Sequence, residues 1–267
     1  MTSKNHFLNQ IVAQAHAVIV EIPRGYGFDF AKKQIEFPAE SNILDFYPTI
    51  HDKQKTEIIN TDDIETLRTK LRGKSQKRQF VILHEVEKMN EAAQNKFLKL
   101  LEEPRGNLNF ILLTTLSDNL LPTVKSRAQI VKIPPTSREN SEEILNKLKI
   151  DDTKRRQILF LAEGLPEEIE RLATDKKYFT ATLKNIETAK QWLSGNDFDR
   201  LVMAAKIKSD REAALNMLES LIKISCATIN ESTAARTARQ LRKILQAYNR
   251  ISKNGSVRAE LLRLILS

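Results

Sequence analysis

The stretch that decides the fold runs over residues 80–127 and reads FVILHEVEKMNEAAQNKFLKLLEEPRGNLNFILLTTLSDNLLPTVKSR. It opens on an apolar run at 80–83, which predicts a buried strand. Apolar residues at helical spacing follow, and a Pro-Arg-Gly sequence at 104–106 predicts the end of that helix. A second apolar run at 110–113 predicts another buried strand. Strands that alternate with helices at this spacing indicate a parallel α/β sheet.

The composition is that of a protein with a sizeable core. The 267 residues allow one large domain or two to three small ones. A hydrophobic content of 41% and a charged content of 29% suit a soluble protein. No apolar run approaches the roughly 18 residues of a membrane span, and MTSKNHFLNQ lacks the order of a signal peptide. We therefore expect a cytoplasmic protein with no membrane partner.

The net charge of +9 fits a nucleic-acid neighbour, although the positive residues are spread along the chain. Local clusters are interpreted as solvated faces rather than DNA contacts. They are Lys74/Lys77/Arg78, Lys154/Arg155/Arg156 and Arg236/Arg239/Arg242/Lys243. The single cysteine, Cys226, excludes an internal disulfide and any Cys-based zinc cluster. Its apolar helical context predicts a small buried thiol.

Three further signals place elements around residues 80–127. The apolar run at 17–22 is rich in β-branched residues and predicts a buried strand. Asp62 and Glu65 resemble a capping box at the start of a helix. Asn90 is suited to cap the helix that follows the strand at 80–83.

The composition shifts at Pro134-Pro135, and no strand is predicted beyond it. Short helices are expected at 141–148, 154–162 and 166–173, and longer ones at 182–193, 198–207, 211–230, 234–251 and 257–266. The chain thus divides into a sheet domain over 1–134, a small helical domain over 135–178 and a larger helical domain over 179–267.

The order of elements, the LEEP sequence at 101–104 and the LLPTVKSR sequence at 120–127 resemble the AAA+ clamp-loader ATPases. The resemblance is strongest over 80–127, moderate in the final helices and poor over 28–60. It implies a degenerate AAA+ sheet domain of the P-loop type, a helical lid and a C-terminal helical collar. In that family the collar is the part through which subunits pack into a ring.

A working phosphate loop reads G-x-x-x-x-G-K-[ST]; its amides cradle phosphates, its lysine neutralises them and its hydroxyl holds magnesium. The corresponding stretch here begins at Pro23, and Gly25 and Gly27 keep the family's spacing. Phe28 stands at the lysine position and Asp29 at the hydroxyl position. A ring thus replaces the ammonium, and a carboxylate would repel polyphosphate. We expect neither hydrolysis nor tight ATP binding; a simple turn without phosphate-loop ancestry is the alternative.

The second half of the expected nucleotide site is altered as well. The strand at 80–83 ends in His84-Glu85, where the family has an acidic pair that positions magnesium and polarises water. His84 is interpreted as an ordinary strand-end residue rather than a metal ligand, and Glu85 as a relic. In the expected lid, Glu167 falls where active AAA+ proteins carry a sensor arginine. We expect no cofactor and no metal.

One part of the ATP machinery is kept. Ser126-Arg127-Ala128 resembles the clamp-loader Ser-Arg-Cys motif, whose arginine reaches across a subunit interface to the γ-phosphate on a neighbour. A guanidinium suits this task because it is always charged, planar and able to bridge two phosphate oxygens. Ala128 is as small as cysteine, so the packing role is kept. An ordinary surface arginine is the alternative for Arg127.

A chain without its own ATP chemistry that keeps an arginine for a neighbour's ATP resembles the delta-prime family of clamp-loader subunits in the DNA polymerase III holoenzyme. The resemblance implies a non-catalytic stator. Its partners would be the ATPase subunits (tau/gamma), the delta subunit, the sliding clamp and, through the assembled complex, primed DNA. Many bacterial relatives carry a zinc module of four cysteines, which one cysteine excludes here.

Two other functions stay open. The chain could be an AAA+ ATPase with an atypical nucleotide site, in which Arg24 or Lys32 supplies the missing cation. It could also be a basic DNA-binding protein on a decayed AAA+ scaffold, for which steeply salt-dependent DNA binding would be diagnostic. Neither accounts for the intact Ser126-Arg127 beside an altered phosphate loop.

Overall fold

A computed structural model describes residues 3–51, 56–71, 77–102, 107–229 and 234–266. The chain forms two compact units, Met1–Glu170 and Arg171–Ser267, which divide within helix α8 (Pro166–Thr174). The division into three domains at 134 and 178 stays a prediction.

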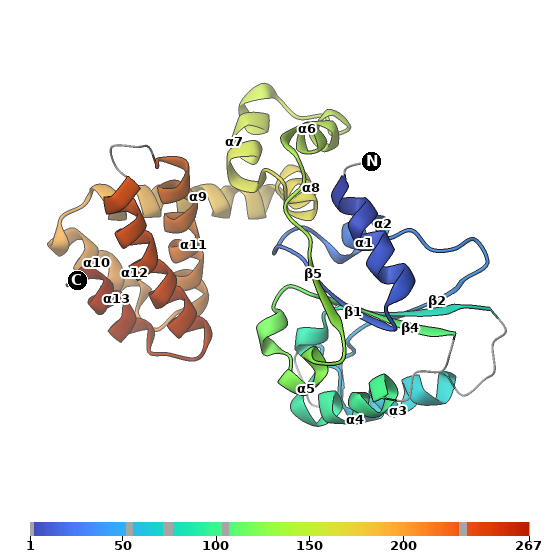
Figure 1. Ribbon diagram of the computed structural model, residues 1–267. Coiled ribbons are helices and arrows are strands. Elements are labelled where there is room, and N and C mark those ends of the chain that lie inside the picture. The colour runs from blue at the N-terminus through green and yellow to red at the C-terminus, as the bar shows by residue number, and fades with distance from the viewer. Residues whose placement is uncertain (1–2, 52–55, 72–76, 103–106, 230–233, 267) are drawn as a thin grey trace. The chain divides into compact units, whose positions relative to one another are not determined.

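The first unit is built on a five-stranded sheet in the order β2-β3-β4-β1-β5, in which every paired neighbour is parallel (Figure 1). The strands are β1 (Ala17–Glu21), β2 (Asn42–Phe46), β3 (Gln79–Leu83), β4 (Leu108–Thr114) and β5 (Gln129–Lys132). The three strands predicted from apolar runs are confirmed as β1, β3 and β4. The sequence reading missed β2 and β5, which are the edge strands of the sheet.

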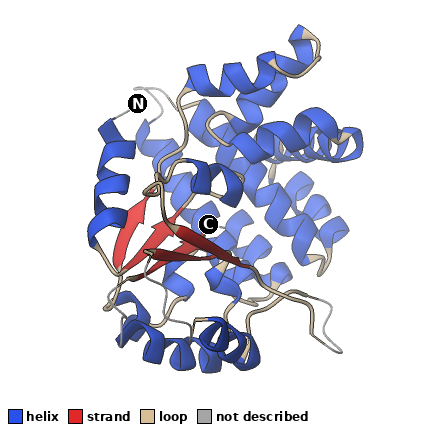
Figure 2. Ribbon diagram, turned by 90° about the vertical axis from the view of Figure 1, so that its right-hand side faces the viewer, coloured by secondary structure: helices blue, strands red, loops and turns tan. Residues whose placement is uncertain are grey.

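Helices cover both faces of this sheet (Figure 1 and Figure 2). One face is covered by α1 (Ser3–Gln14) and α2 (Phe28–Lys33), and the other by α3 (Thr61–Lys70), α4 (Glu91–Glu102) and α5 (Pro122–Lys125). Along β1, Val18 and Val20 enter the core beneath α1 and α2, whereas Ile19 enters the core beneath α3 and α4. Burial on both faces explains why the central strands are continuous apolar runs.

The capping of α3 differs from the prediction. Its N-cap is Asn60, whose side chain accepts hydrogen bonds from the backbone N–H of Asp62 and Asp63, and Asp63 accepts one in return from the Asn60 N–H. The predicted box of Asp62 and Glu65 is therefore wrong by two residues, because an asparagine capped by an aspartate satisfies the same orphan amides. At α4, the Asn90 side chain accepts from the Ala93 N–H at 2.8 Å, which confirms the predicted cap.

After β5 the described chain is helical, as predicted. The first unit adds α6 (Arg138–Asn146), α7 (Asp152–Ala162) and the start of α8, and the second unit contains α9 (Lys176–Ser194), α10 (Asp197–Ile207), α11 (Arg211–Ala227), α12 (Ala234–Ser252) and α13 (Val257–Ile265). The predicted fold class is confirmed as a parallel α/β sheet domain followed by helices. The predicted break at 104–106 lies outside the described residues.

Cys226 corrects another prediction, because its side chain is exposed. The buried face of α11 includes Leu221, Ile224 and Ser225. Cys226 lies two residues beyond Ile224, about 200° around the helix, and so faces away from that core.

No described helix is long and apolar enough to cross a membrane.

Candidate functional site

The remnant of the phosphate loop follows β1 and packs against the first turn of α8. Gly25 and Gly27 have φ angles of 79° and 91°, which favour glycine. The Glu168 N–H donates to the Gly25 carbonyl at 2.9 Å, and a Cβ on Gly25 would lie 2.9 Å from the Glu168 Cβ. A Cβ on Gly27 would lie 3.0 Å from the Glu167 Cβ. The two glycines therefore allow close approach of a helix that carries two carboxylates.

The helix that follows the loop is poorly suited to hold phosphate. α2 has only six residues, and its N-cap Gly27 offers no side-chain hydrogen bond. Asp29 lies in its first turn and is exposed. A carboxylate there complements the positive end of the helix, the place where a working phosphate loop binds its anion.

The structure brings together the two altered halves of the predicted nucleotide site. The rings of Phe28 and His84 meet edge to face with centroids 6.3 Å apart. The ring of Tyr47 stacks on the ring of His84, with centroids 4.1 Å apart and an interplanar angle of 15°. His84 is 1% exposed. Aromatic side chains thus meet at the two positions that the sequence resemblance assigns to the family's lysine and its magnesium-binding carboxylate.

A charged network joins this aromatic cluster to the edge strand β2. His84 Nε2 lies 2.9 Å from Asp45 Oδ1, and Lys32 Nζ lies 2.6 Å from Asp45 Oδ2. Burial alone would raise the pKa of the Asp45 carboxyl, but the hydrogen bonds from Lys32 and His84 outweigh it, so this pKa lies below its ordinary value. Lys32, the cation that an atypical ATPase would need, is therefore engaged by Asp45.

Glu85 is held by a local ion pair. It adopts the left-handed conformation with φ 51°, and its carboxylate forms an ion pair with Lys88 at 2.7 Å. The adjacent Glu87 turns inward and accepts hydrogen bonds from the N–H and the hydroxyl of Thr115. Neither acidic side chain contacts His84 in the described hydrogen-bond network.

Arg127 and the loop remnant lie at opposite ends of the adjacent parallel strands β1 and β5. It follows α5, two residues before β5, and the pairing of Gln129 with Val18 places it level with the start of β1. The loop remnant follows the other end of β1. The five residues of β1 span about 16 Å, so Arg127 is too far away to reach the nucleotide position of its own chain.

The Arg127 guanidinium is held by local contacts. It forms an ion pair with Glu102 at 2.7 Å and donates to the Thr123 carbonyl at 3.0 Å, and Nη1 lies 3.4 Å from the Ser126 hydroxyl. Ser126 is the C-cap of α5, and Ala128 packs against the hydrophobic core, as its small size predicts. The Arg127 side chain is 36% exposed and that of Glu102 is 48% exposed.

Arg127 also lines an open cavity of about 710 Å³. The other lining residues come from the end of α1, the start of β1, the end of α4 and the segment up to β5: Gln14, Ala15, His16, Ala17, Leu101, Glu102, Ser126, Ala128 and Gln129. A guanidinium held weakly at the mouth of such a cavity is available to an anion presented from outside the chain.

A family comparison matches a segment that includes Asp45, His84 and Arg127 but not the loop remnant. Residues 32–137 match the family described as "DNA polymerase III, delta subunit". The delta-prime subunit of DNA polymerase III from Pseudomonas aeruginosa is 35% identical over 97 residues, which are 36% of this chain and 30% of that protein. The delta-prime subunit from Haemophilus influenzae is 34% identical over 105 residues, 39% of this chain and 32% of that protein. The matched segment is similar to delta-prime subunits of DNA polymerase III.

The matched stretch spans only about a third of the length of these delta-prime relatives. Solved structures are similar over more of the chain. A DNA polymerase III gamma subunit-related protein from Thermotoga maritima is 21% identical, covers 99% of this chain and 98% of its own, and has a TM-score of 0.48. The Thermotoga maritima RuvB branch migration motor is 16% identical, covers 84% of this chain and 77% of its own, and has a TM-score of 0.47.

Proposed function

We propose that this chain is the non-catalytic stator of a replicative clamp loader and that Arg127 acts in trans on ATP bound by a neighbouring subunit. The supporting observation is the separation of Arg127 from the loop remnant by the length of β1. An arginine that cannot reach its own nucleotide position can serve only a nucleotide held by another chain. The exposed guanidinium at the 710 Å³ cavity is consistent with that role.

The same proposal holds that the chain itself neither hydrolyses nor tightly binds ATP. Phe28 and His84 meet where a lysine and a magnesium-binding carboxylate are needed, and α8 packs on the loop with Glu167 and Glu168. Such a site would place carboxylates near polyphosphate and has a ring at the position of the family's lysine. The chain would therefore need no nucleotide and no zinc.

The experiment that tests the proposal is ATP turnover by a reconstituted complex of this chain, its cognate ATPase and delta subunits, the sliding clamp and primed DNA. Turnover is compared between the wild-type chain and Arg127→Ala. Turnover should fall with Arg127→Ala, and unchanged turnover in an intact complex would contradict the proposal.

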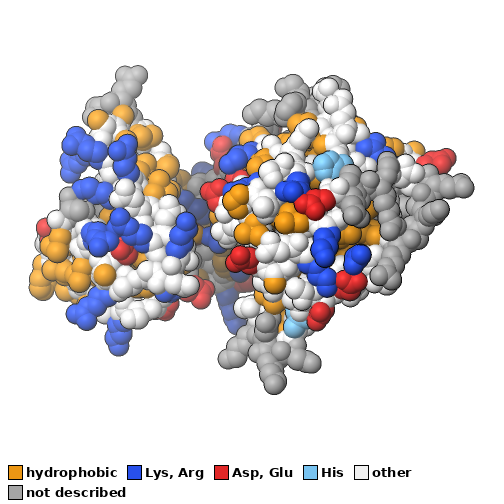
Figure 3. Space-filling model, turned by 60° about the horizontal axis from the view of Figure 1, so that its bottom comes forward, with side chains coloured by type: hydrophobic (Ala, Val, Ile, Leu, Met, Phe, Trp, Pro, Cys, Tyr) orange, Lys and Arg blue, Asp and Glu red, His pale blue; other side chains and the backbone are white. Residues whose placement is uncertain are grey.

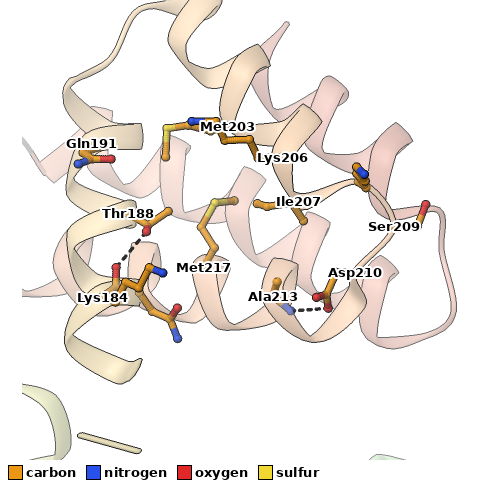
Figure 4. Close-up of a pocket in the computed structure, with 12 residues that line it drawn as sticks. Lys184, Thr188, Gln191, Met203, Lys206, Ile207, Ser209, Asp210, Ala213 and Met217 are labelled. Atoms are coloured by element: carbon orange, nitrogen blue, oxygen red, sulfur yellow. Dashed lines mark hydrogen bonds between the residues drawn. The ribbon is translucent and has the colours of Figure 1, made fainter. Parts of the chain in front are cut away.

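We also propose that the second unit packs with other subunits in the cytoplasm to form the ring. α10 has no buried residue, and it exposes three apolar side chains, Phe198, Leu201 and Val202. Beside it, a cavity of about 840 Å³ opens among α9, α10 and α11, with Met203, Ile207 and Met217 in its wall (Figure 4). An exposed apolar helix face beside a hollow lined by both apolar and polar side chains is typical of a surface that another protein covers.

Glu102 provides a prediction about how Arg127 is released. Exposed ion pairs contribute only about 0–1 kcal/mol, so Glu102→Gln should change the free energy of unfolding by less than about 1 kcal/mol. Because Arg127 must leave Glu102 to reach a phosphate, turnover of the reconstituted complex should rise, by up to about fivefold. Glu142→Gln, which breaks the exposed ion pair with Arg138, is the matched control and should leave turnover unchanged. A fall in turnover with Glu102→Gln would mean that Glu102 orients Arg127 for catalysis rather than holding it back.

An AAA+ ATPase with an atypical site is the second candidate, and it depends on a cation near the loop. Lys32 is committed to Asp45 at 2.6 Å, which counts against this candidate. We predict that calorimetric titration of the chain with magnesium-ATP gives no saturable binding at concentrations below about 1 mM. A working clamp-loader ATPase subunit serves as the positive control. Saturation at micromolar ATP would favour the ATPase instead.

A further inference from the structure

The net positive charge of the chain resides in its second unit. Residues 171–267 hold 18 Lys and Arg against 9 Asp and Glu, whereas residues 1–170 hold 25 of each. The second unit therefore carries the whole net charge of +9, although the positive residues themselves are spread along both units. On the face of this unit that Figure 3 shows at left, Lys and Arg side chains gather in several groups among few acidic ones.

Part of this charge lines a groove of about 420 Å³ formed by α10, α12, α13 and the end of α9. Its lining residues are Trp192, Arg200, Arg236, Arg239, Gln240, Lys243, Ile244, Leu264 and Ile265. Four of these described residues are cationic and none is acidic. Such an imbalance favours an anionic ligand over a neutral one.

Three of the cations come from one stripe of α12. Arg236, Arg239 and Lys243 are spaced by three and four residues, so they lie on one helix face and span about 10 Å along the axis. All three are exposed. Neither Arg236 nor Arg239 forms a hydrogen bond or an ion pair with any residue that the structure describes. These two guanidiniums are exposed, and neither holds a residue that the structure describes.

The fourth cation is fixed in place. The Arg200 Nε donates to the Trp192 carbonyl at 3.0 Å, and its Nη1 lies 3.1 Å from Asp197. One carboxylate therefore compensates part of the charge on the α10 side of the groove. The positive potential is strongest along the α12 stripe.

We propose that this groove binds the phosphate backbone of nucleic acid. Guanidiniums suit phosphate because the planar fork can donate to two oxygens at once, and three of the four cations are arginines. Trp192, Ile244 and Ile265 are buried, so the groove offers no stacking platform for bases. Leu264 is the one apolar lining residue that is partly exposed, which leaves little apolar contact for an acidic peptide. Binding should therefore be independent of sequence and strongly dependent on salt. The sequence alone indicates only a solvated face for this cluster, and the proposal does not depend on the role of Arg127.

The test is fluorescence anisotropy of the full chain with a labelled primed duplex, measured from 50 to 200 mM salt. The groove variant is Arg236→Gln/Arg239→Gln/Lys243→Gln. The control variant, Lys176→Gln/Lys177→Gln/Lys190→Gln, removes the same charge from exposed positions on α9, and none of these residues lines the groove. Because each phosphate contact contributes about 0.9 to the slope of log K against log salt, the groove variant should lower the slope by about 2 to 3. It should also weaken binding at low salt by at least about tenfold relative to the control variant.

Three results would overturn the proposal. One is the absence of DNA binding by the wild-type chain at 50 mM salt. Another is an equal loss in the groove variant and in the control variant, which would mean that only net charge matters. The third is displacement of the DNA by polyglutamate at equal charge concentration, together with polyglutamate binding that depends less on salt than DNA binding does. That result would identify an acidic protein segment as the occupant. Circular dichroism of both variants verifies that the helices are intact.

Discussion

Replacing Arg127 by alanine should abolish most ATP turnover at the site that this subunit faces in the assembled clamp loader. Arginine fingers supplied in trans contribute roughly 10³–10⁵ to the rate, so turnover at that site should fall by on the order of 10³. The fold should not suffer, because the contacts of Arg127 with Glu102, Thr123 and Ser126 are all at the surface. Phosphate release by the reconstituted complex is the measurement, with size-exclusion chromatography to verify assembly.

Two further variants separate the finger from a general effect of charge. Arg127→Lys keeps the charge but loses the planar fork, so it should recover only a small part of the turnover. Arg138→Ala removes an arginine that is 60% exposed and likewise ion-paired on the first unit, and it should leave turnover unchanged. Unchanged turnover with Arg127→Ala in an intact complex would make Arg127 an ordinary surface residue and the chain a passive spacer.

The elements that the sequence predicted correctly are those buried on both sides or strongly periodic. β1, β3 and β4 lie in the middle of the sheet and therefore read as continuous apolar runs. The strands that were missed, β2 and β5, are at the edges, where burial is partial and the apolar pattern is diluted. The helices after residue 134 were found because amphipathic periodicity does not depend on distant contacts.

The candidate site shows a similar limit. Substitutions at Phe28, Asp29 and His84 could be read from a motif because each stands at a fixed spacing. Asp45 and Tyr47 could not, because they lie far along the chain and reach His84 only through the pairing of β2 with β3. An aspartate and a tyrosine within the apolar run NILDFY were the available signal, but nothing in the sequence specified their partner. The structure therefore changes the interpretation of His84 from an ordinary strand-end residue to the centre of a cluster with Phe28, Asp45 and Tyr47.

This cluster predicts that restoring the family's carboxylate would damage the fold rather than recover a magnesium site. His84→Asp would place a second carboxylate in a position that is 1% exposed and next to Asp45. A buried charge without a partner costs about 3–5 kcal/mol of unfolding free energy. Urea denaturation at pH 8 should show a loss of that size.

His84→Asn is the matched control for His84→Asp. Asparagine has nearly the same shape as aspartate, so it creates the same cavity beneath Tyr47 without adding charge. It should cost about 1–3 kcal/mol, and the difference between the two variants isolates the repulsion. Burial and the nearby Asp45 would raise the pKa of the introduced carboxyl above its unfolded value of about 3.9. A group whose pKa is raised in the folded state loses stability as the pH rises through that pKa. The difference in unfolding free energy between His84→Asp and His84→Asn should therefore become smaller from pH 8 to pH 5.

Adding Asp45→Asn to His84→Asp should recover part of the loss, because the repulsion between the two carboxyl groups is then removed. The opposite result would be informative in a specific way. If His84→Asp were as stable as His84→Asn at pH 8 and gained stability on addition of magnesium, the acidic position would still be open to a metal. His84 would then be a simple loss from a working site. If the two His84 variants differ in unfolding free energy as predicted, Lys32, Asp45 and Tyr47 fill the position where the family would bind magnesium. A single substitution at residue 84 then cannot restore a magnesium site.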